Sequence, residues 1–194
     1  TATTTTKQVT TTMPTTKPTT KRTYPASAPI KVACVGDSIT AGGYWQNNLQ
    51  GCLPTDRYTV LGFGVSGTTG LYSGLDWNSV TYAFDVPKAY VDEEKYASSL
   101  SCGADIVVVM LGTNDSKDYN WEQLQGDPTQ YIVDMTNLVR SYQQSEAQST
   151  VLIALPPTAF SSTARINNTV IEKEIIPALR QVAANTGAAI IDTH

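Results

Sequence analysis

The stretch Gly36-Asp37-Ser38-Ile39-Thr40 directly follows an apolar run at residues 30–35, and it decides the fold that we expect. An apolar run that ends in a polar turn places the Ser38 hydroxyl at the carboxyl end of a strand. Two more apolar runs end similarly, one before Val65-Ser66-Gly67 and one before Gly112-Thr113-Asn114-Asp115. Open α/β sheets bind ligands beyond the carboxyl ends of their strands. The sequence therefore predicts a serine, a glycine amide and an asparagine amide at one such edge.

From residue 29 onward, apolar runs alternate with segments of helical period. A short helix is expected through Trp45 and Leu49. The other predicted helices cover residues 92–100, 129–144 and 170–185, and the predicted strands cover residues 30–35, 58–63, 105–111, 150–155 and 188–191. Five strands with intervening helices favour an α/β fold with a doubly wound parallel sheet. At 194 residues the chain is expected to hold one domain, at residues 29–194, behind a tail at residues 1–28.

The tail is a tract of Thr, Lys and Pro that lacks the apolar residues needed to offset the entropy of ordering, so it is expected to be an extended linker. Such tracts are typical of O-glycosylated stalks, which predicts a secreted protein that has already lost its signal peptide. The candidate glycosylated residues include Thr3, Thr4, Thr5, Thr10, Thr11, Thr15, Thr16, Thr19 and Thr20. Packing of the tail against a neighbouring subunit is a second expectation.

Charge and hydropathy narrow the classes of partner. The tail has four basic residues and no acidic one, so a whole-chain charge of −4 leaves the remainder at about −8. That balance argues against binding of nucleic acid. No stretch approaches the roughly 20 apolar residues of a membrane span. With one histidine and no clustered cysteines, neither a transition-metal site nor any other cofactor is expected.

At the three turns the chain resembles the SGNH (GDSL-type) hydrolases. Their first block reads like Gly36-Asp37-Ser38-Ile39-Thr40, their second centres on a glycine like Gly67, and their third reads like Gly112-Thr113-Asn114-Asp115. Met110 to Lys117 and the stretch Glu174-Ile175-Ile176-Pro177 look like members that act as carbohydrate or acyl esterases. The resemblance covers residues 29–194 with the motifs in the right order. It implies a flavodoxin-like, five-stranded sheet with strand order 2-1-3-4-5.

The resemblance also implies a mechanism. Ser38 would be the nucleophile, and the backbone N–H groups of Ser38 and Gly67, with the Asn114 amide, would form the oxyanion hole. The residue types suit ester hydrolysis, which needs a nucleophile, a base and donors for the oxyanion. Alternatively, Ser38 is a turn residue that only caps the following helix.

The general base is the point at which the sequence departs from the family, because the Asp-x-x-His block is not in this chain. The only histidine is His194, the last residue, in the sequence Asp192-Thr193-His194. In a 2-1-3-4-5 sheet the fifth strand lies three spacings from the first, roughly 14 Å at about 4.8 Å each. That distance is beyond hydrogen-bond reach of Ser38, so His194 is a poor candidate for the base.

Two hypotheses remain. In the first, the domain is incomplete at its C-terminal end and belongs to an extracellular esterase of glycan O-acetyl or other acyl esters. In the second, it is an inactive structural or adhesive subunit of an extracellular glycoprotein assembly or filament, with self-assembly through the tail.

Residues 71–91 form a long insertion rich in Tyr, Trp and Gly, without a clear period. Loops of this length are usually functional, and in the family this region borders the substrate cleft. Tyr72, Trp77 and Tyr82 are therefore candidate substrate contacts, although a self-packed surface loop would also explain them. The pattern Gly62-Phe63-Gly64-Val65-Ser66-Gly67 fits a dinucleotide fingerprint only superficially, because no convincing helix follows it.

Two covalent features complete the predictions. Cys52 and Cys102 are expected to form a disulfide near the sheet edge, given the oxidising setting that the tail suggests. Cys34 lies within the first apolar run and is expected to be a buried core residue. Asn167-Asn168-Thr169 is an N-glycosylation sequon at Asn167 in a predicted surface loop.

Overall fold

The computed structural model describes residues 28–161 and 163–194. The predictions for the Thr-rich tail, namely its glycosylation and its role in self-assembly, fall on residues outside that part of the chain.

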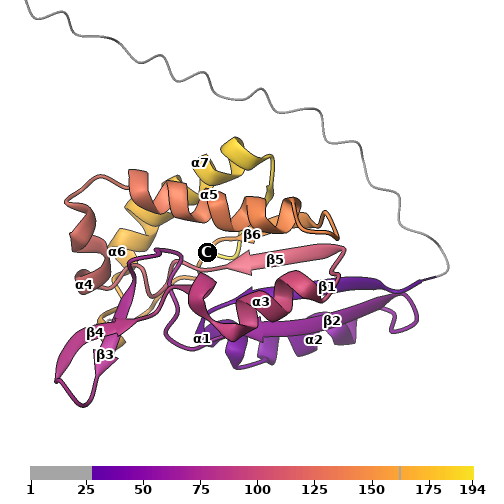
Figure 1. Ribbon diagram of the computed structural model, residues 1–194, viewed down its shortest axis with the longest axis horizontal. Helices are drawn as coiled ribbons and strands as arrows, with labels where there is room; N and C mark the ends of the chain where they lie inside the picture. Colours follow the sequence, from indigo (N-terminus) through magenta and orange to yellow (C-terminus); the bar gives the residue numbers. More distant parts are fainter. Residues whose placement is uncertain (1–27, 162) are drawn as a thin grey trace, which may run out of the picture.

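A five-stranded parallel sheet forms the centre of the molecule (Figure 1). Its strands are β1 (Ile30–Gly36), β2 (Tyr58–Gly64), β5 (Ile106–Met110), β6 (Thr150–Ala154) and β7 (Ala189–Ile191). The strand order is β2-β1-β5-β6-β7, which confirms the 2-1-3-4-5 order. Gly36 pairs with Gly64 on one side and with Met110 on the other, so three strands end at the same level. The turns that follow β1, β2 and β5 therefore start side by side.

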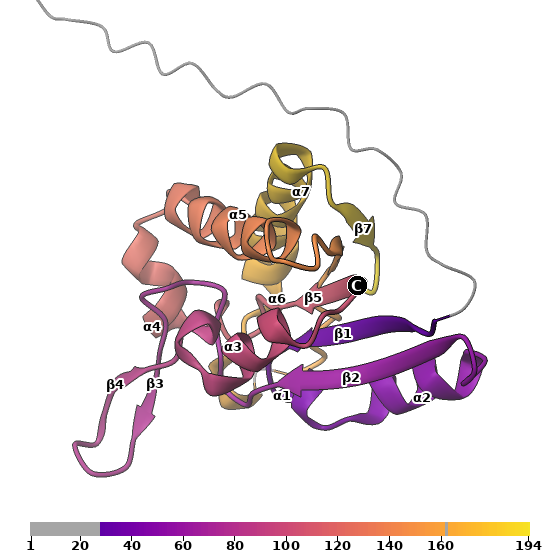
Figure 2. The same ribbon diagram turned by 45° about the vertical axis from the view of Figure 1, so that its right-hand side comes forward.

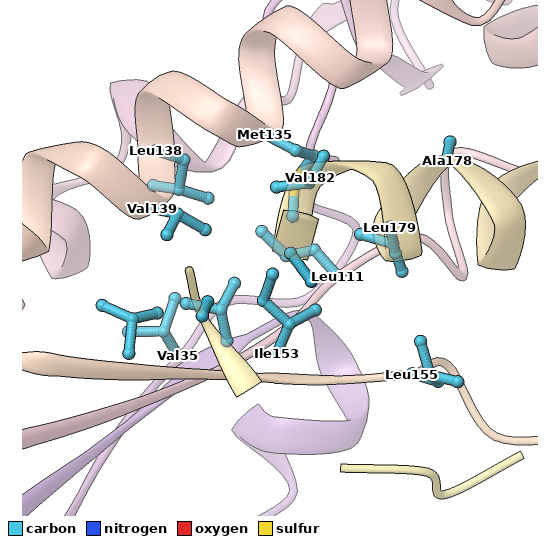
Figure 3. Close-up of a cluster of buried hydrophobic side chains, with 14 of the residues drawn as sticks. Val35, Leu111, Met135, Leu138, Val139, Ile153, Leu155, Ala178, Leu179 and Val182 are labelled. Atoms are coloured by element: carbon cyan, nitrogen blue, oxygen red, sulfur yellow. The ribbon is translucent and has the colours of Figure 1, made fainter. Parts of the chain in front are cut away.

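Helices cover both faces of this sheet. Strand side chains alternate between the faces: Val35 and Val109 belong to the larger core cluster, and Cys34 and Val108 to the smaller one. Helices α5 (Thr129–Gln143) and α7 (Ile176–Thr186) lie above the sheet in Figure 2 and α2 (Tyr44–Cys52) lies below it. Figure 3 shows Leu138 on α5 and Val182 on α7 pointing toward the strand side chains of the larger core.

The insertion at residues 71–91 contains a two-stranded antiparallel hairpin of β3 (Leu75–Asn78) and β4 (Ala83–Pro87). The sequence predicted only a loop here. The residues of both strands are half-buried or exposed, and each strand is short, so the brief alternation in Leu75-Asp76-Trp77-Asn78 is a weak strand signal. It projects from the body of the molecule next to α4 (Asp118–Trp121), as both Figure 1 and Figure 2 show. Helix α1 (Ser38–Ala41) follows β1 at the edge of the sheet.

The remaining helices connect these elements. They are the 3-10 helix η1 (Tyr90–Asp92), α3 (Glu94–Ser101), α4 (Asp118–Trp121), η2 (Glu122–Leu124), η3 (Thr163–Arg165), α6 (Asn168–Val170) and the π-helix η4 (Ile171–Ile175). The single helix predicted at residues 170–185 is therefore interrupted by a π-helical turn. Pro177 lies just beyond this turn, and because proline has no backbone N–H, it cannot continue the regular hydrogen-bond ladder there.

The predicted disulfide between Cys52 and Cys102 is wrong, since both are free thiols in the structure. Cys52 is the last residue of α2, whose Leu49 packs against the smaller core cluster. Cys102 follows α3 and packs against the larger cluster, on the opposite face of the sheet. Its sulfur lies 3.1 Å from the Ser99 carbonyl oxygen, to which it donates a hydrogen bond. The expectation for Cys34 is confirmed, because its side chain is fully buried.

Candidate active site

Ser38 is the first residue of α1, directly after β1, and it is exposed. The preceding Asp37 caps this short helix, because its Oδ1 accepts a hydrogen bond of 2.9 Å from the Ile39 N–H. Asp37 is 1% exposed, and its Oδ2 has no hydrogen-bond partner in the structure. Burial raises the pKa of the Asp37 carboxyl to about 6, although the hydrogen bond from Ile39 opposes the shift. Asp37 thus fixes the turn that presents Ser38.

The turn after β2 brings Gly67 to the same edge. Val65 N–H donates to the Gly36 carbonyl oxygen at 2.9 Å, which ties this turn to the end of β1. Gly67 has φ +83°, a left-handed conformation that glycine adopts without steric cost. A Cβ at this position would lie 2.6 Å from Asp76 Oδ2. The backbone conformation therefore favours glycine here, and a Cβ would displace the Asp76 carboxylate.

Asn114 follows β5 and is 5% exposed. Its side-chain Nδ2 donates a 3.0 Å hydrogen bond to the Thr68 carbonyl oxygen, which joins the third turn to the Gly67 turn. An amide nitrogen carries two hydrogens, so one remains for another acceptor. The backbone is fixed as well, because the Asn114 carbonyl oxygen accepts a 3.0 Å hydrogen bond from Asn120 Nδ2.

Asp115 is completely buried and holds the second and third turns together. Its two oxygens accept hydrogen bonds from Gly70 N–H at 3.0 Å and Leu71 N–H at 2.8 Å. Burial raises the pKa of this carboxyl to about 6, although the hydrogen bonds from the two backbone N–H groups favour the charged form and oppose the shift. An aspartate five residues past the end of β5 gave no sequence signal for this bridging role.

A cleft of about 290 Å³ adjoins these turns. Ile39 and Thr113, the chain neighbours of Ser38 and Asn114, form part of its wall. The segment after β6 supplies the remaining lining residues: Pro157, Thr158, Ala159, Phe160, Ser161, Ala164 and Ile166. None of the site residues predicted from the sequence lies in this segment, so sequence reasoning missed this wall.

His194 does not reach Ser38. Its Nδ1 lies 2.9 Å from the Pro156 carbonyl oxygen, and its Nε2 lies 3.5 Å from Glu172 Oε1. Both ring nitrogens are therefore engaged at the β6–β7 side of the sheet, as the strand order implied.

The three aromatic residues predicted to contact substrate lie in two places. Trp77 and Tyr82 are on the β3–β4 hairpin, with exposures of 47% and 78%. Tyr72 lies instead near α3 and α5, where its N–H donates to Asp134 Oδ2 at 2.9 Å. Burial, and then the nearby groups of Tyr96 and Asp134, raise the pKa of Tyr72 to about 12. Only Trp77 and Tyr82 thus form one surface.

The Asn167 side chain caps α6, with its Oδ1 accepting from Thr169 N–H at 3.0 Å. Asn167 is exposed, and its glycosylation stays a prediction. Among the residues that the structure describes, no group of three His, Cys, Asp or Glu side chains could hold a metal ion. No helix in residues 28–161 and 163–194 combines the length and apolar character that a bilayer crossing requires.

Comparison with known proteins identifies the family and similar folds. The GDSL-like Lipase/Acylhydrolase family matches residues 34–194. An acetylxylan esterase from Xylanibacter ruminicola is 33% identical over 88% of this chain. Among solved structures, a carbohydrate acetylesterase family member from Sinorhizobium meliloti has 25% identity and a TM-score of 0.58, with 84% of this chain and 82% of that one covered. An aryl esterase from M. smegmatis has 20% identity and a TM-score of 0.58, covers 84% and 83%, and is similar in fold.

The fold and site define an α/β protein with a serine and amide donors at the carboxyl edge of a flavodoxin-like sheet. This chain belongs to the GDSL-like lipase/acylhydrolase family. It spans 37% of the length of the acetylxylan esterase that it matches.

Proposed function

We propose that this domain hydrolyses acetyl or other acyl esters of carbohydrates through Ser38. The hydrogen bond from Asn114 Nδ2 to the Thr68 carbonyl oxygen carries the proposal, because it sets an amide donor against the Gly67 turn beside Ser38. Preorganised donors of this kind stabilise the oxyanion of acyl transfer.

In this mechanism, Ser38 Oγ attacks the ester carbonyl carbon, and its proton passes to a base. The carbonyl oxygen takes up the negative charge and accepts hydrogen bonds from Ser38 N–H, Gly67 N–H and Asn114 Nδ2. The tetrahedral intermediate expels the sugar alcohol, which leaves with a proton, and an acyl-serine forms. Water then attacks the acyl group through a second oxyanion and releases the carboxylic acid. Among the described residues, His194 is turned away from this site.

The substrate class comes from the relatives. One is an acetylxylan esterase, and another is a carbohydrate acetylesterase family member. We therefore propose a sugar as the alcohol and acetate as the acyl group. An extracellular location is part of this proposal, because a polymeric glycan substrate would be encountered outside the cell.

A second candidate function is a glycan-binding or structural subunit that keeps the scaffold without turnover. The engagement of both His194 nitrogens with Pro156 and Glu172 favours it, because Ser38 then has no base among the described residues. Without the base, a serine of this kind keeps only residual rate enhancement.

Hydrolysis of p-nitrophenyl acetate and release of acetate from acetylated xylan separate these two functions. The esterase predicts turnover that disappears in Ser38→Ala and persists in Ser73→Ala, a control at an exposed serine. No turnover above background in the wild type would contradict it and favour the non-catalytic subunit, and turnover that is equal in wild type and Ser38→Ala would contradict the role of Ser38.

A further inference from the structure

The β3–β4 hairpin presents an aromatic surface that the proposed chemistry does not use. Trp77 and Tyr82 lie on it with ring centroids 6.3 Å apart at an interplanar angle of 71°. Tyr82 has φ +52°, an unusual backbone conformation for a bulky residue. Residues held in such conformations cluster at ligand-binding sites.

Packing behind Trp77 holds its ring in place. Trp77 contacts Phe84 edge-on at 5.2 Å, and Phe84 in turn stacks on Tyr119 at 3.9 Å and 16°. The Arg165 guanidinium lies 5.0 Å from the Phe84 ring centroid and donates to Asp118 Oδ1 at 2.9 Å. A ring fixed in this way loses little further freedom when it binds a ligand.

Asp76, which precedes Trp77 on β3, lies beside Gly67 of the candidate active site. Asp76 Oδ2 lies 2.6 Å from the position that a Cβ on Gly67 would occupy. Asp76 Oδ1 lies 3.7 Å from Lys117 Nζ and accepts a long hydrogen bond of 3.4 Å from the Tyr119 hydroxyl. The pairing of β3 with β4 shifts between Asp76 and Trp77, and such bulges re-aim side chains. The hairpin therefore carries a carboxylate beside Gly67, paired with Lys117, and an exposed aromatic pair farther along it.

We propose that Trp77 and Tyr82 form a stacking subsite for a sugar ring outside the ester pocket, and that the partly exposed Asp76, held by the buried Lys117, binds hydroxyl groups between the two. The proposal rests on the proposed function and adds that the substrate is an oligosaccharide. A sugar ring has a C–H face that packs on an aromatic ring and a rim of hydroxyls. Those hydroxyls can donate to a carboxylate. Such a surface would extend the binding site along the glycan chain.

The test compares a small ester with a large one. Trp77→Ala is expected to lower kcat/KM for acetylated xylohexaose about tenfold, mostly through KM, because one aromatic contact is worth about that factor. Hydrolysis of p-nitrophenyl acetate, which cannot reach the hairpin, should not change. Trp77→Phe should keep most of the activity. Val80→Ala is the matched control, since Val80 is on the same hairpin and 84% exposed.

A binding measurement makes the result independent of turnover. Calorimetric titration of the Ser38→Ala protein with xylohexaose should give a dissociation constant that rises about tenfold when Trp77→Ala is added. If no ester is hydrolysed but this binding difference holds, the proposed function fails and the subsite stands. If hydrolysis depends on Ser38 but Trp77→Ala changes neither KM nor binding, the subsite is overturned. The subsite would also be overturned if Trp77→Ala lowered kcat/KM equally for both esters, or if its only effect were to abolish self-association of the protein.

Discussion

Asn114 and Thr68 are 46 residues apart in the sequence, yet the Asn114 side-chain amide donates a 3.0 Å hydrogen bond to the Thr68 carbonyl oxygen. This contact joins the turn after β5 to the turn after β2 at the edge where Ser38 follows β1. It leaves one amide hydrogen of Asn114 for the oxyanion, and the side chain is already oriented before an ester binds.

Replacement of Asn114 tests its role as a donor. Asn114→Ala is expected to lower kcat for p-nitrophenyl acetate by about 10²–10³, with little change in KM, because the donor acts mainly in the transition state. Asn120→Ala is the matched control, since Asn120 Nδ2 holds the Asn114 backbone but donates to no oxyanion. Equal loss of kcat in both variants would show that Asn114 only supports the loop.

Gly67→Ala tests the tight turn, with Gly126→Ala as its control. Gly126 has nearly the same backbone conformation, φ +82°, but nothing lies within 4 Å of a Cβ there. Both changes should lower the free energy of unfolding by about 1 kcal/mol, measured with urea. Only Gly67→Ala displaces Asp76 and should also lower kcat. A full loss of activity in Gly126→Ala would contradict this distinction.

The buried carboxyls predict how stability varies with pH. Burial raises the pKa of Asp37 in the folded state to about 6, above its ordinary value of 3.8. Between about pH 4 and pH 6 the folded state therefore binds more protons than the unfolded state. Its stability should fall as the pH rises through this window. In Asp37→Asn, part of that decline, of order 2 kcal/mol, should be absent.

Urea unfolding at pH 4 and pH 8 measures this difference. Asn keeps the capping oxygen for Ile39, so the helix cap is preserved in the variant. An identical decline with pH in wild type and variant would contradict the assignment to Asp37.

The cysteines make a separate prediction. A thiol count under denaturing, non-reducing conditions should give three free thiols, because Cys34, Cys52 and Cys102 are all unpaired. In the native protein Cys52, which is exposed, should react first. Cys34 should react only after unfolding, since burial raises its pKa to about 12 and leaves almost no thiolate. A count of one free thiol would contradict this prediction and support a disulfide between Cys52 and Cys102.

The sequence predicts the sheet well because parallel strands buried on both faces are continuous apolar runs. Residues 106–110 show this most clearly. The placement of the turns that carry Ser38, Gly67 and Asn114 at one edge was also predictable, since parallel strands end there. The prediction of a disulfide was wrong because the spacing of Cys52 and Cys102 in the sequence does not tell on which face of the sheet each one lies.

The hairpin and the bridging groups were beyond sequence reasoning. Strands β3 and β4 span only four and five residues, so any alternation of apolar and polar residues in them is too short to mark them as strands within a long loop. The position of Asp76 beside Gly67, and of Asp115 beneath the second turn, depends on how distant loops fold back. Neither residue had a local signal for its role.

Covalent labelling is the most direct test of the site, because it asks which hydroxyl attacks an electrophile. The protein is incubated with an acyl-phosphonate ester probe, and the modified peptide is located by mass spectrometry. The account predicts a single adduct on Ser38, formed much more slowly in Asn114→Ala and absent in Ser38→Ala. An adduct on another residue, or ester turnover that persists without Ser38, would contradict it.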